Sequence, residues 1–271
     1  MPFVVLTAIV CVVYVGLRFK MTALVMAATG AGLGLASPPI GFWWLHWFLW
    51  VPVILSMRPG ENKRNFRMAY LAGLVGLGVC FFWISVAITH YSNLPRPVAL
   101  LAVLLFAAAY ALPFALSFVA VQPLRQRFPK AWVFLVPAIA VATEFALLAI
   151  DQITGIRLAL FPYFQGATQY RVLPLVQIAS LTGIYTMTYL VYLGNCAIAE
   201  CFFQRRETGQ ILWKIPGIVG AILLLNAVWG QSRVQHVQAT IEDWPTAKIT
   251  QLQQDLTMEE RMQKAAAGAR S

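Results

Sequence analysis

Charged side chains are scarce in this sequence. Asp, Glu, Lys and Arg make up 11% of the 271 residues, whereas hydrophobic residues make up 60%. Soluble domains usually hold about 25% charged and about 45–50% apolar residues, so too few charges remain here to cover a water-exposed surface. The mean hydropathy of +0.71 agrees with this. The composition excludes an ordinary soluble domain and predicts a polytopic membrane protein.

Acidic residues are especially few, with ten against twenty basic residues and a formal net charge of +10. A basic excess can indicate nucleic-acid binding. Here the basic residues form short clusters between apolar runs, where they act as orientation signals for membrane helices. We therefore expect no nucleic-acid partner.

Cysteine and histidine are too scattered to predict a metal site. No two cysteines form a CxxC pair, and no histidine has a spacing suited to zinc. The four cysteines lie in or beside apolar runs, which predicts inert thiols at Cys11, Cys80, Cys196 and Cys201. We expect no catalytic residue and no metal ligand among them.

Two histidines lie near the ends of apolar segments. His46 stands among four tryptophans in the stretch 42–50, a pattern typical of an aromatic belt at the membrane interface. As an alternative, His46 or His90 would ligate the metal of a tetrapyrrole pigment, since neutral imidazole is a common ligand. An interfacial hydrogen bond is the simpler interpretation of both, so the expected bound molecule is phospholipid rather than a cofactor.

Eight apolar segments predict an all-α membrane protein with about eight transmembrane helices. No basic n-region or cleavage site precedes the first segment, so we interpret it as a retained helix and not as a signal peptide. The expected division is a transmembrane domain over 1–230 and an extramembrane tail over 231–271. The segments are 2–18, 21–37, 40–57, 68–90, 97–121, 132–150, 173–199 and 211–230.

Glycines in two of these segments predict close contacts between helices. Gly30 and Gly34 form a GxxxG pair in the second segment, and the fourth contains Gly73, Gly76 and Gly78. Small residues at such spacings let helix backbones approach each other in a membrane.

Glu144 is the one carboxylate inside a predicted span, in the otherwise uncharged run 132–150. Placing a carboxylate there costs about 2.5–3.5 kcal/mol on insertion scales unless it finds a partner or water. Either Glu144 is a structural residue bonded to neighbouring helices, or it belongs to a polar binding pocket.

An aromatic segment with two amide side chains follows Glu144, between two predicted spans. Its aromatic rings either form an interfacial belt or line a cavity for a lipid chain or headgroup. With Glu144, the candidates for the lipid cavity are Phe161, Pro162, Tyr163, Gln165 and Gln169.

Several short motifs occur in order along the chain: Ala36-Ser37-Pro38-Pro39, Phe82-Trp83-Ile84, Leu94-Pro95, Pro137 with Thr143-Glu144-Phe145, Phe161-Pro162-Tyr163 with Gln165, then Gln177, Gly183, Tyr185 and Asn195, and lastly the stretch 249–256. Their order and spacing resemble the membrane portion of apolipoprotein N-acyltransferase, the bacterial enzyme that adds the third acyl chain to lipoproteins. The resemblance implies the bacterial inner membrane, and it makes the tail 231–271 the start of a nitrilase-like domain.

In that family a Glu-Lys-Cys triad of the nitrilase-like domain carries the reaction, and the cysteine takes an acyl chain from phospholipid as a thioester. The matched motifs of this sequence do not reach that triad. The sequence also departs from the pattern at Ala146, which replaces an arginine, and at Tyr163, which replaces a tryptophan. We therefore expect no catalysis by this chain alone.

Two functions remain open. The first is an acyltransferase-like membrane module that works with a nitrilase-type catalytic domain on another chain. The second is a non-catalytic subunit that packs lipid, pigment or partner helices in a larger membrane complex. Membrane lipids are partners in both.

Alternate loops differ strongly in basic residues, which predicts the orientation. Twelve basic residues lie in one set of loops, which the positive-inside rule places in the cytoplasm, and three lie in the opposite short loops. Both termini and the segment 151–171 are then expected on the outer, periplasmic side. We predict that single cysteines introduced at Asn62 and at Ser232 react with an impermeant thiol reagent from opposite sides of the membrane; labelling from one side would contradict this orientation.

Overall fold

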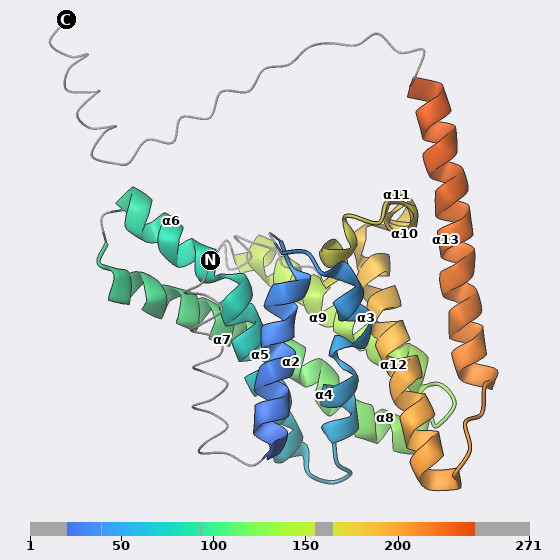
Figure 1. Cartoon of the computed structure of the whole chain (residues 1–271). Helices are drawn as coiled ribbons and strands as arrows, with labels where there is room; N and C mark the ends of the chain where they lie inside the picture. The colour runs from blue at the N-terminus through green and yellow to red at the C-terminus, as the bar shows by residue number, and fades with distance from the viewer. Residues whose placement is uncertain (1–20, 39, 93, 155–164, 242–271) are drawn as a thin grey trace, which may run out of the picture.

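The computed structural model describes residues 21–38, 40–92, 94–154 and 165–241, and every regular element within these ranges is a helix. Figure 1 shows a helical bundle in which α13 runs along α12 and projects beyond the other helices. The elements are α2 (Met21–Ala36), η1 (Trp43–Leu45), α3 (His46–Leu49), α4 (Val51–Ser56), α5 (Asn62–Cys80), α6 (Phe82–Ser92), α7 (Arg96–Val119), α8 (Val121–Arg127), α9 (Trp132–Thr154), η2 (Gln165–Gln169), α10 (Leu173–Val176), α11 (Ala179–Thr182), α12 (Ile184–Thr208) and α13 (Lys214–Ile241).

The predicted all-α class is confirmed for the described residues, but the number of spans is smaller than eight by length and composition. Three helical segments qualify as membrane spans: Arg96–Arg127, Trp132–Ala149 and Lys214–Ile241. The pair α5 and α6, bent by 43°, makes a fourth if it is one broken span. The apolar segments Thr22–Ala36, Trp43–Ser56 and Leu173–Thr182 are shorter, and the predicted first span, 2–18, lies outside the described residues.

Two predicted boundaries were wrong. The segment 173–199 is not one helix, because Gly183 has φ 74° and ψ 179° and separates α11 from α12. Only glycine adopts this conformation readily. The last helix continues past 230 to Ile241. Hydropathy marks where the apolar stretch ends, whereas the polar residues after it contain no Gly or Pro before Ile241 and sustain the helix.

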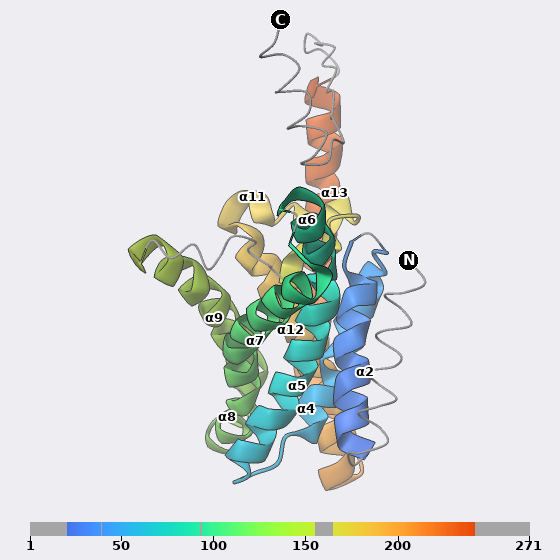
Figure 2. The same cartoon turned by 90° about the vertical axis from the view of Figure 1, so that its left-hand side faces the viewer.

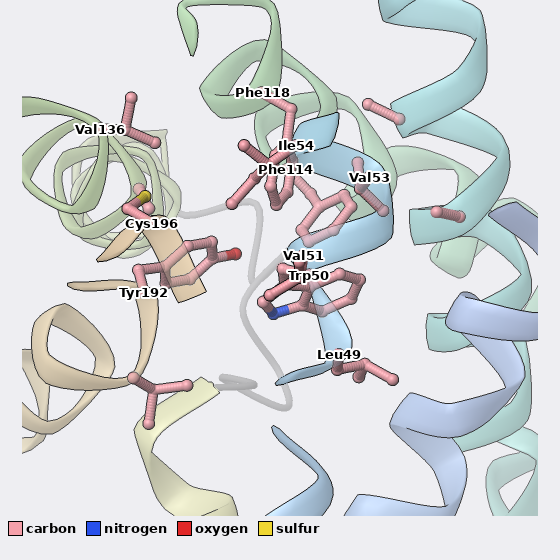
Figure 3. Packing of buried hydrophobic residues seen from close by; sticks show 14 of the residues in the cluster. Leu49, Trp50, Val51, Val53, Ile54, Phe114, Phe118, Val136, Tyr192 and Cys196 are labelled. Carbon is pink, nitrogen blue, oxygen red and sulfur yellow. The ribbon is translucent and has the colours of Figure 1, made fainter. Parts of the chain in front are cut away.

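The centre of the core lies where α3 and α4, α7 and α12 meet. Trp50 is fully buried, and its ring centroid lies 4.6 Å from that of Phe114 and 5.8 Å from that of Phe118. Figure 3 shows Tyr192 of α12 beside this aromatic group. Aromatic pairs at these separations add to the stabilisation that comes from burial.

The glycine motifs predicted close helix contacts without naming the partners, and the structure packs α2 against α5; Figure 2 shows these two helices side by side. A Cβ atom added at Gly76 would lie 3.0 Å from the carbonyl oxygen of Gly30, and one added at Gly30 would overlap the carbonyl oxygen of Ala72. Gly78 differs, since a Cβ there would meet nothing within 4 Å. The close contact therefore depends on Gly30 and Gly76, and also on Gly34, where an added Cβ would overlap the side chain of Val79, but not on Gly78.

The connections α4–α5, α8–α9 and α12–α13 lie toward the lower end of the bundle in Figures 1 and 2, and most basic residues of the described ranges lie in these connections or in the helix turns beside them. Arg125 of α8 joins this helix to α12. Its guanidinium group binds both carboxylate oxygens of Glu207 at 2.7 Å and lies 4.2 Å from the ring centroid of Phe203. Its Nε lies 3.8 Å from Glu200, which accepts further hydrogen bonds from Trp132 and Gln204.

We predict opposite effects for two Gly→Ala substitutions on α2 and α5. Gly30→Ala should lower the unfolding free energy by about 1–3 kcal/mol, because the methyl group pushes α2 away from α5. Gly78→Ala is the matched control and should leave stability unchanged or raise it by up to about 1 kcal/mol, since alanine favours a helix and meets open space. Thermal denaturation of both variants in detergent checks this, and an equal loss in both would contradict the glycine contact.

Candidate functional site

Glu144 joins three elements through its carboxylate group. It lies on α9, and its Oε1 accepts a hydrogen bond of 3.1 Å from the backbone N–H of Gln165 at the start of η2. Its Oε2 accepts one of 3.0 Å from the hydroxyl group of Thr188 on α12. Both carboxylate oxygens therefore have partners, as a polar group within a membrane span requires.

Thr188 also binds η2 directly. Its hydroxyl oxygen donates to Glu144 and accepts a hydrogen bond of 2.9 Å from the backbone N–H of Gly166. The approach is so close that a Cβ atom at Gly166 would lie 2.5 Å from the backbone nitrogen of Thr188 and 2.8 Å from Cβ of Met187. Only glycine lets η2 lie directly against α12.

A second chain of hydrogen bonds leads from the core to η2 and fixes the tautomer of His46. The indole Nε1–H of Trp50 can only donate, and it lies 3.1 Å from His46 Nε2, which must accept. His46 Nδ1 then carries the hydrogen and donates to Thr168 Oγ1 at 2.8 Å. The Thr168 hydroxyl in turn donates to the carbonyl oxygen of Gln165 at 2.9 Å. This arrangement holds a neutral imidazole.

Gln169, at the end of η2, is fully buried and binds the tryptophan-rich segment. Its Nε2 donates to the carbonyl oxygen of Trp43 at 3.0 Å and to Thr168 Oγ1 at 3.1 Å. Its Oε1 accepts from the indole N–H of Trp47 at 3.0 Å. Gln169 therefore ties η2 to η1 and α3.

Asn195 of α12 supports the turn between α3 and α4. Its Oδ1 accepts from the backbone N–H of Trp50 at 2.9 Å, and its Nδ2 donates to the carbonyl oxygens of His46 and Val191 at 2.9 and 2.8 Å. The side chain is fully buried. Asn195 thus satisfies backbone groups that the short helices leave unpaired.

A small cavity of about 30 Å³ lies beside Glu144 and Gln165, with room for one water molecule. Its polar lining comes from these two residues with Thr143, Tyr110 and Tyr192, and the remaining walls are apolar. Gln165 is buried, and its Oε1 has no hydrogen-bond partner among the residues that the structure describes. The cavity therefore offers a water molecule two polar partners next to the η2 backbone.

The structure brings together two of the predicted lipid-cavity residues, Glu144 and Gln165. Gln169 lies on the same short helix but faces the tryptophans. The other three predicted residues, Phe161, Pro162 and Tyr163, lie outside the described residues.

The tryptophan-rich stretch 42–50 is only partly the interfacial belt that its composition predicted. Trp44 is half exposed, as expected for a belt residue. Trp50 and His46 are fully buried, because α3 packs against α12 and Asn195 holds its backbone. His46 is hydrogen-bonded as expected, and its partners Trp50 and Thr168 lie inside the protein.

Neither ring nitrogen of His46 is open to a pigment metal, since Trp50 and Thr168 occupy both. His90 lies near the end of α6 with its ring 4.9 Å from that of Tyr91. Within the described ranges, no three His, Cys, Asp or Glu side chains are grouped so that they could hold a metal ion.

Sequence reasoning missed the two threonines that complete the network, Thr168 and Thr188. Threonine is common in membrane helices, so nothing in its immediate sequence marks these two. Asn195, as an amide side chain in a long apolar run, gave a stronger signal that a polar partner was needed.

We predict that Thr188→Val lowers the unfolding free energy by about 1–3 kcal/mol, because it keeps the volume but leaves a Glu144 oxygen and the Gly166 N–H without their partner. Thr186→Val is the matched control on the same helix, since Thr186 bonds only the exposed Thr182 hydroxyl. Thermal denaturation in detergent gives the difference, and similar stability of the two variants would count against the network.

Comparisons with known proteins place this chain among its relatives. The model of the apolipoprotein N-acyltransferase N-terminal domain matches residues 29–197, which include all the residues of the network. The chain is 28% identical over 224 residues to the apolipoprotein N-acyltransferase of Geobacter metallireducens, which covers 79% of this chain and 40% of the relative. It is 25% identical over 223 residues to that of Haemophilus ducreyi, which covers 82% of this chain and 40% of the relative.

A shorter match, 38% identical over 69 residues, is to the apolipoprotein N-acyltransferase of Gloeobacter violaceus and covers 25% of this chain and 13% of the relative. The two long matches therefore span about 40% of the length of their relatives. Since the family model covers more than half of the chain, this protein belongs to the family defined by the apolipoprotein N-acyltransferase N-terminal domain.

Proposed function

We propose that this chain forms the membrane part of an apolipoprotein N-acyltransferase in the bacterial inner membrane and that it does not transfer acyl chains alone. The observation that carries the proposal is the family match over 29–197. In the full arrangement we propose, the shorter apolar helices complete about eight spans, and η2 faces the periplasm. The catalytic chemistry then belongs to a nitrilase-type domain outside the membrane.

The polar network gives this membrane part a defined task. Gln165 and Gly166 donate their backbone N–H groups to side chains of α9 and α12, and Gln169 binds the stretch that holds Trp43 and Trp47. Three regions of the chain therefore fix η2, which follows the segment 155–164 in sequence. We propose that this segment, with Phe161, Pro162 and Tyr163, lines the place where a phospholipid lies, and that Glu144 supports it from below.

The cysteines of the described part of the chain support the absence of activity. A thioester mechanism needs an accessible thiolate beside a base. Cys196 is fully buried among apolar side chains, and the thiol of Cys80 lies 3.3 Å from the hydroxyl of Ser37 within the helix pair α2 and α5. The buried Cys196 cannot meet a lipid and an acceptor amine together, and the Ser37 hydroxyl beside the partly exposed Cys80 is not a base that would form a thiolate.

Cys201 is partly exposed and follows Glu200 directly in α12. Glu200 does not serve it as a base, because its two carboxylate oxygens accept hydrogen bonds from Trp132 at 3.0 Å and from Gln204 at 2.8 Å. Glu200 is thus committed to holding α9 and the end of α12 together.

A non-catalytic subunit of a larger membrane complex is the second candidate function. It is favoured by α13, because only 17% of the apolar stretch with which this helix could cross the membrane is buried inside the protein. Large apolar side chains point away from the bundle along this helix, among them Leu224, Leu225 and Val228, each more than 60% exposed. Lipid or a partner helix would cover such a face in the membrane.

We predict that the purified chain, incubated with phospholipid and a diacylated lipopeptide, gives no triacylated product and no hydroxylamine-sensitive acyl-cysteine. The physical reason is that the members of a catalytic triad act as a unit, so binding alone adds little to the rate. Mass spectrometry of the lipopeptide and of the intact chain measures both products.

Either product from this chain alone would overturn the proposal. Adding a nitrilase-type domain separates the two candidate functions. Product that forms only after the addition supports the acyltransferase module. If a domain that is active with another membrane part gives no product here, the result supports the structural subunit. The Thr188→Val variant should lower the yield of the combined reaction, whereas Thr186→Val should not.

A further inference from the structure

A pocket lies at the basic end of the bundle, and none of the residues that line it belongs to the network around Glu144. It has a volume of about 560 Å³, within the range of about 300–1,000 Å³ that small-molecule sites occupy. Residues of α2, α4, α5 and α12 line it. Three of them are arginines, Arg58, Arg64 and Arg206.

The rest of the lining is largely apolar and comes from the helices that enter the membrane. Val25 and Met26 of α2 face the pocket together with Pro52 and Leu55 of α4. The pocket thus combines guanidinium groups with a wall of aliphatic side chains. A phospholipid has the same two parts, a phosphate group joined to acyl chains.

The positions of two of the arginines are fixed before any ligand binds. Arg64 Nη1 donates to the carbonyl oxygen of Ser56 at 2.8 Å. The backbone of Arg58 is held at both ends by the fully buried Asn65, with Arg58 N–H donating at 2.9 Å and Asn65 Nδ2 donating to its carbonyl oxygen at 2.7 Å. Such preorganisation lowers the ordering cost of binding.

The local charge favours an anion. One carboxylate lies near, that of Glu61, which is 3.6 Å from Arg58 and 3.5 Å from Arg64. Glu207, beside Arg206 in sequence, is bound by Arg125 instead. Arg206 itself forms no ion pair or hydrogen bond with the residues that the structure describes, so three guanidinium groups face a single carboxylate.

We propose that this pocket binds the phosphate group of an anionic phospholipid of the cytoplasmic leaflet, with an acyl chain along Val25 and Leu55. The basic loops lie at this end, and the positive-inside rule places them in the cytoplasm. Basic pockets between membrane helices on that side suit anionic headgroups, and guanidinium groups bind phosphate through paired hydrogen bonds. The site is separate from the proposed acyl transfer on the opposite side.

The test uses the full chain, stripped of lipid in detergent and titrated with phosphatidylglycerol, with native mass spectrometry to count bound lipids. Arg58→Gln with Arg206→Gln should weaken binding about 25-fold, on the basis of about fivefold for each arginine near a headgroup. The matched control, Arg127→Gln with Arg205→Gln, removes two charges at the same end outside the pocket and should change binding less than about twofold. Arg206→Gln alone, at an exposed side chain with no internal partner, should weaken binding about fivefold and leave the melting temperature unchanged.

Two further arms identify the ligand. Phosphatidylcholine should bind more weakly than phosphatidylglycerol in the wild type, and inorganic phosphate should displace phosphatidylglycerol only at a large excess. Equal loss in the pocket and control variants, equal binding of the two lipids, or displacement by phosphate at equal concentration would each overturn the proposal.

Discussion

The hydrogen bonds between Glu144, Thr188 and the η2 backbone are the interaction on which the position of η2 depends. A short helix such as η2 cannot satisfy its own backbone N–H groups, and those of Gln165 and Gly166 are instead taken up by side chains of α9 and α12. A carboxylate within a span is costly without partners. The side chains of Glu144 and Thr188 therefore accept the N–H groups of η2, and one of these N–H groups helps to satisfy the carboxylate. The elements α9, α12 and η2 are joined at this point.

The same principle explains the tryptophan-rich segment. The short helical pieces η1, α3, α4, η2, α10 and α11 leave more backbone groups unpaired than long helices would, and polar side chains supply partners for some of them. Asn195 bonds the backbone of His46 and Trp50, and Gln169 bonds that of Trp43. The aromatic core around Trp50 then packs against a backbone that is already fixed.

Features that follow from composition or local spacing were predictable from the sequence. The scarcity of charge and the apolar segments gave the all-α membrane class, the glycine motifs gave close helix contacts without their partners, and the apolar run around Glu144 marked this residue as one that needs a partner. The motif order also gave the family, which the match over 29–197 shows.

Features that depend on distant partners were not predictable. The hydroxyl of Thr188 matters only because Gly166 and Glu144 meet it in space, 22 and 44 residues away in the sequence. Hydropathy joined α11 to α12 because it does not register the conformation of Gly183. The hydrogen bonds of His46 likewise depend on Trp50 and Thr168, and the second of these lies in η2, 122 residues away in the sequence.

Hydrogen–deuterium exchange of the η2 segment tests most directly whether Glu144 fixes it. In the wild-type chain the amide hydrogens of Gln165 and Gly166 should exchange slowly, because both are bonded to side chains of membrane helices. In Glu144→Ala they should exchange at least about tenfold faster, while Phe145→Ala, at an exposed neighbouring side chain, should leave them protected. Fast exchange in the wild type, or protection that persists without Glu144, would contradict this account.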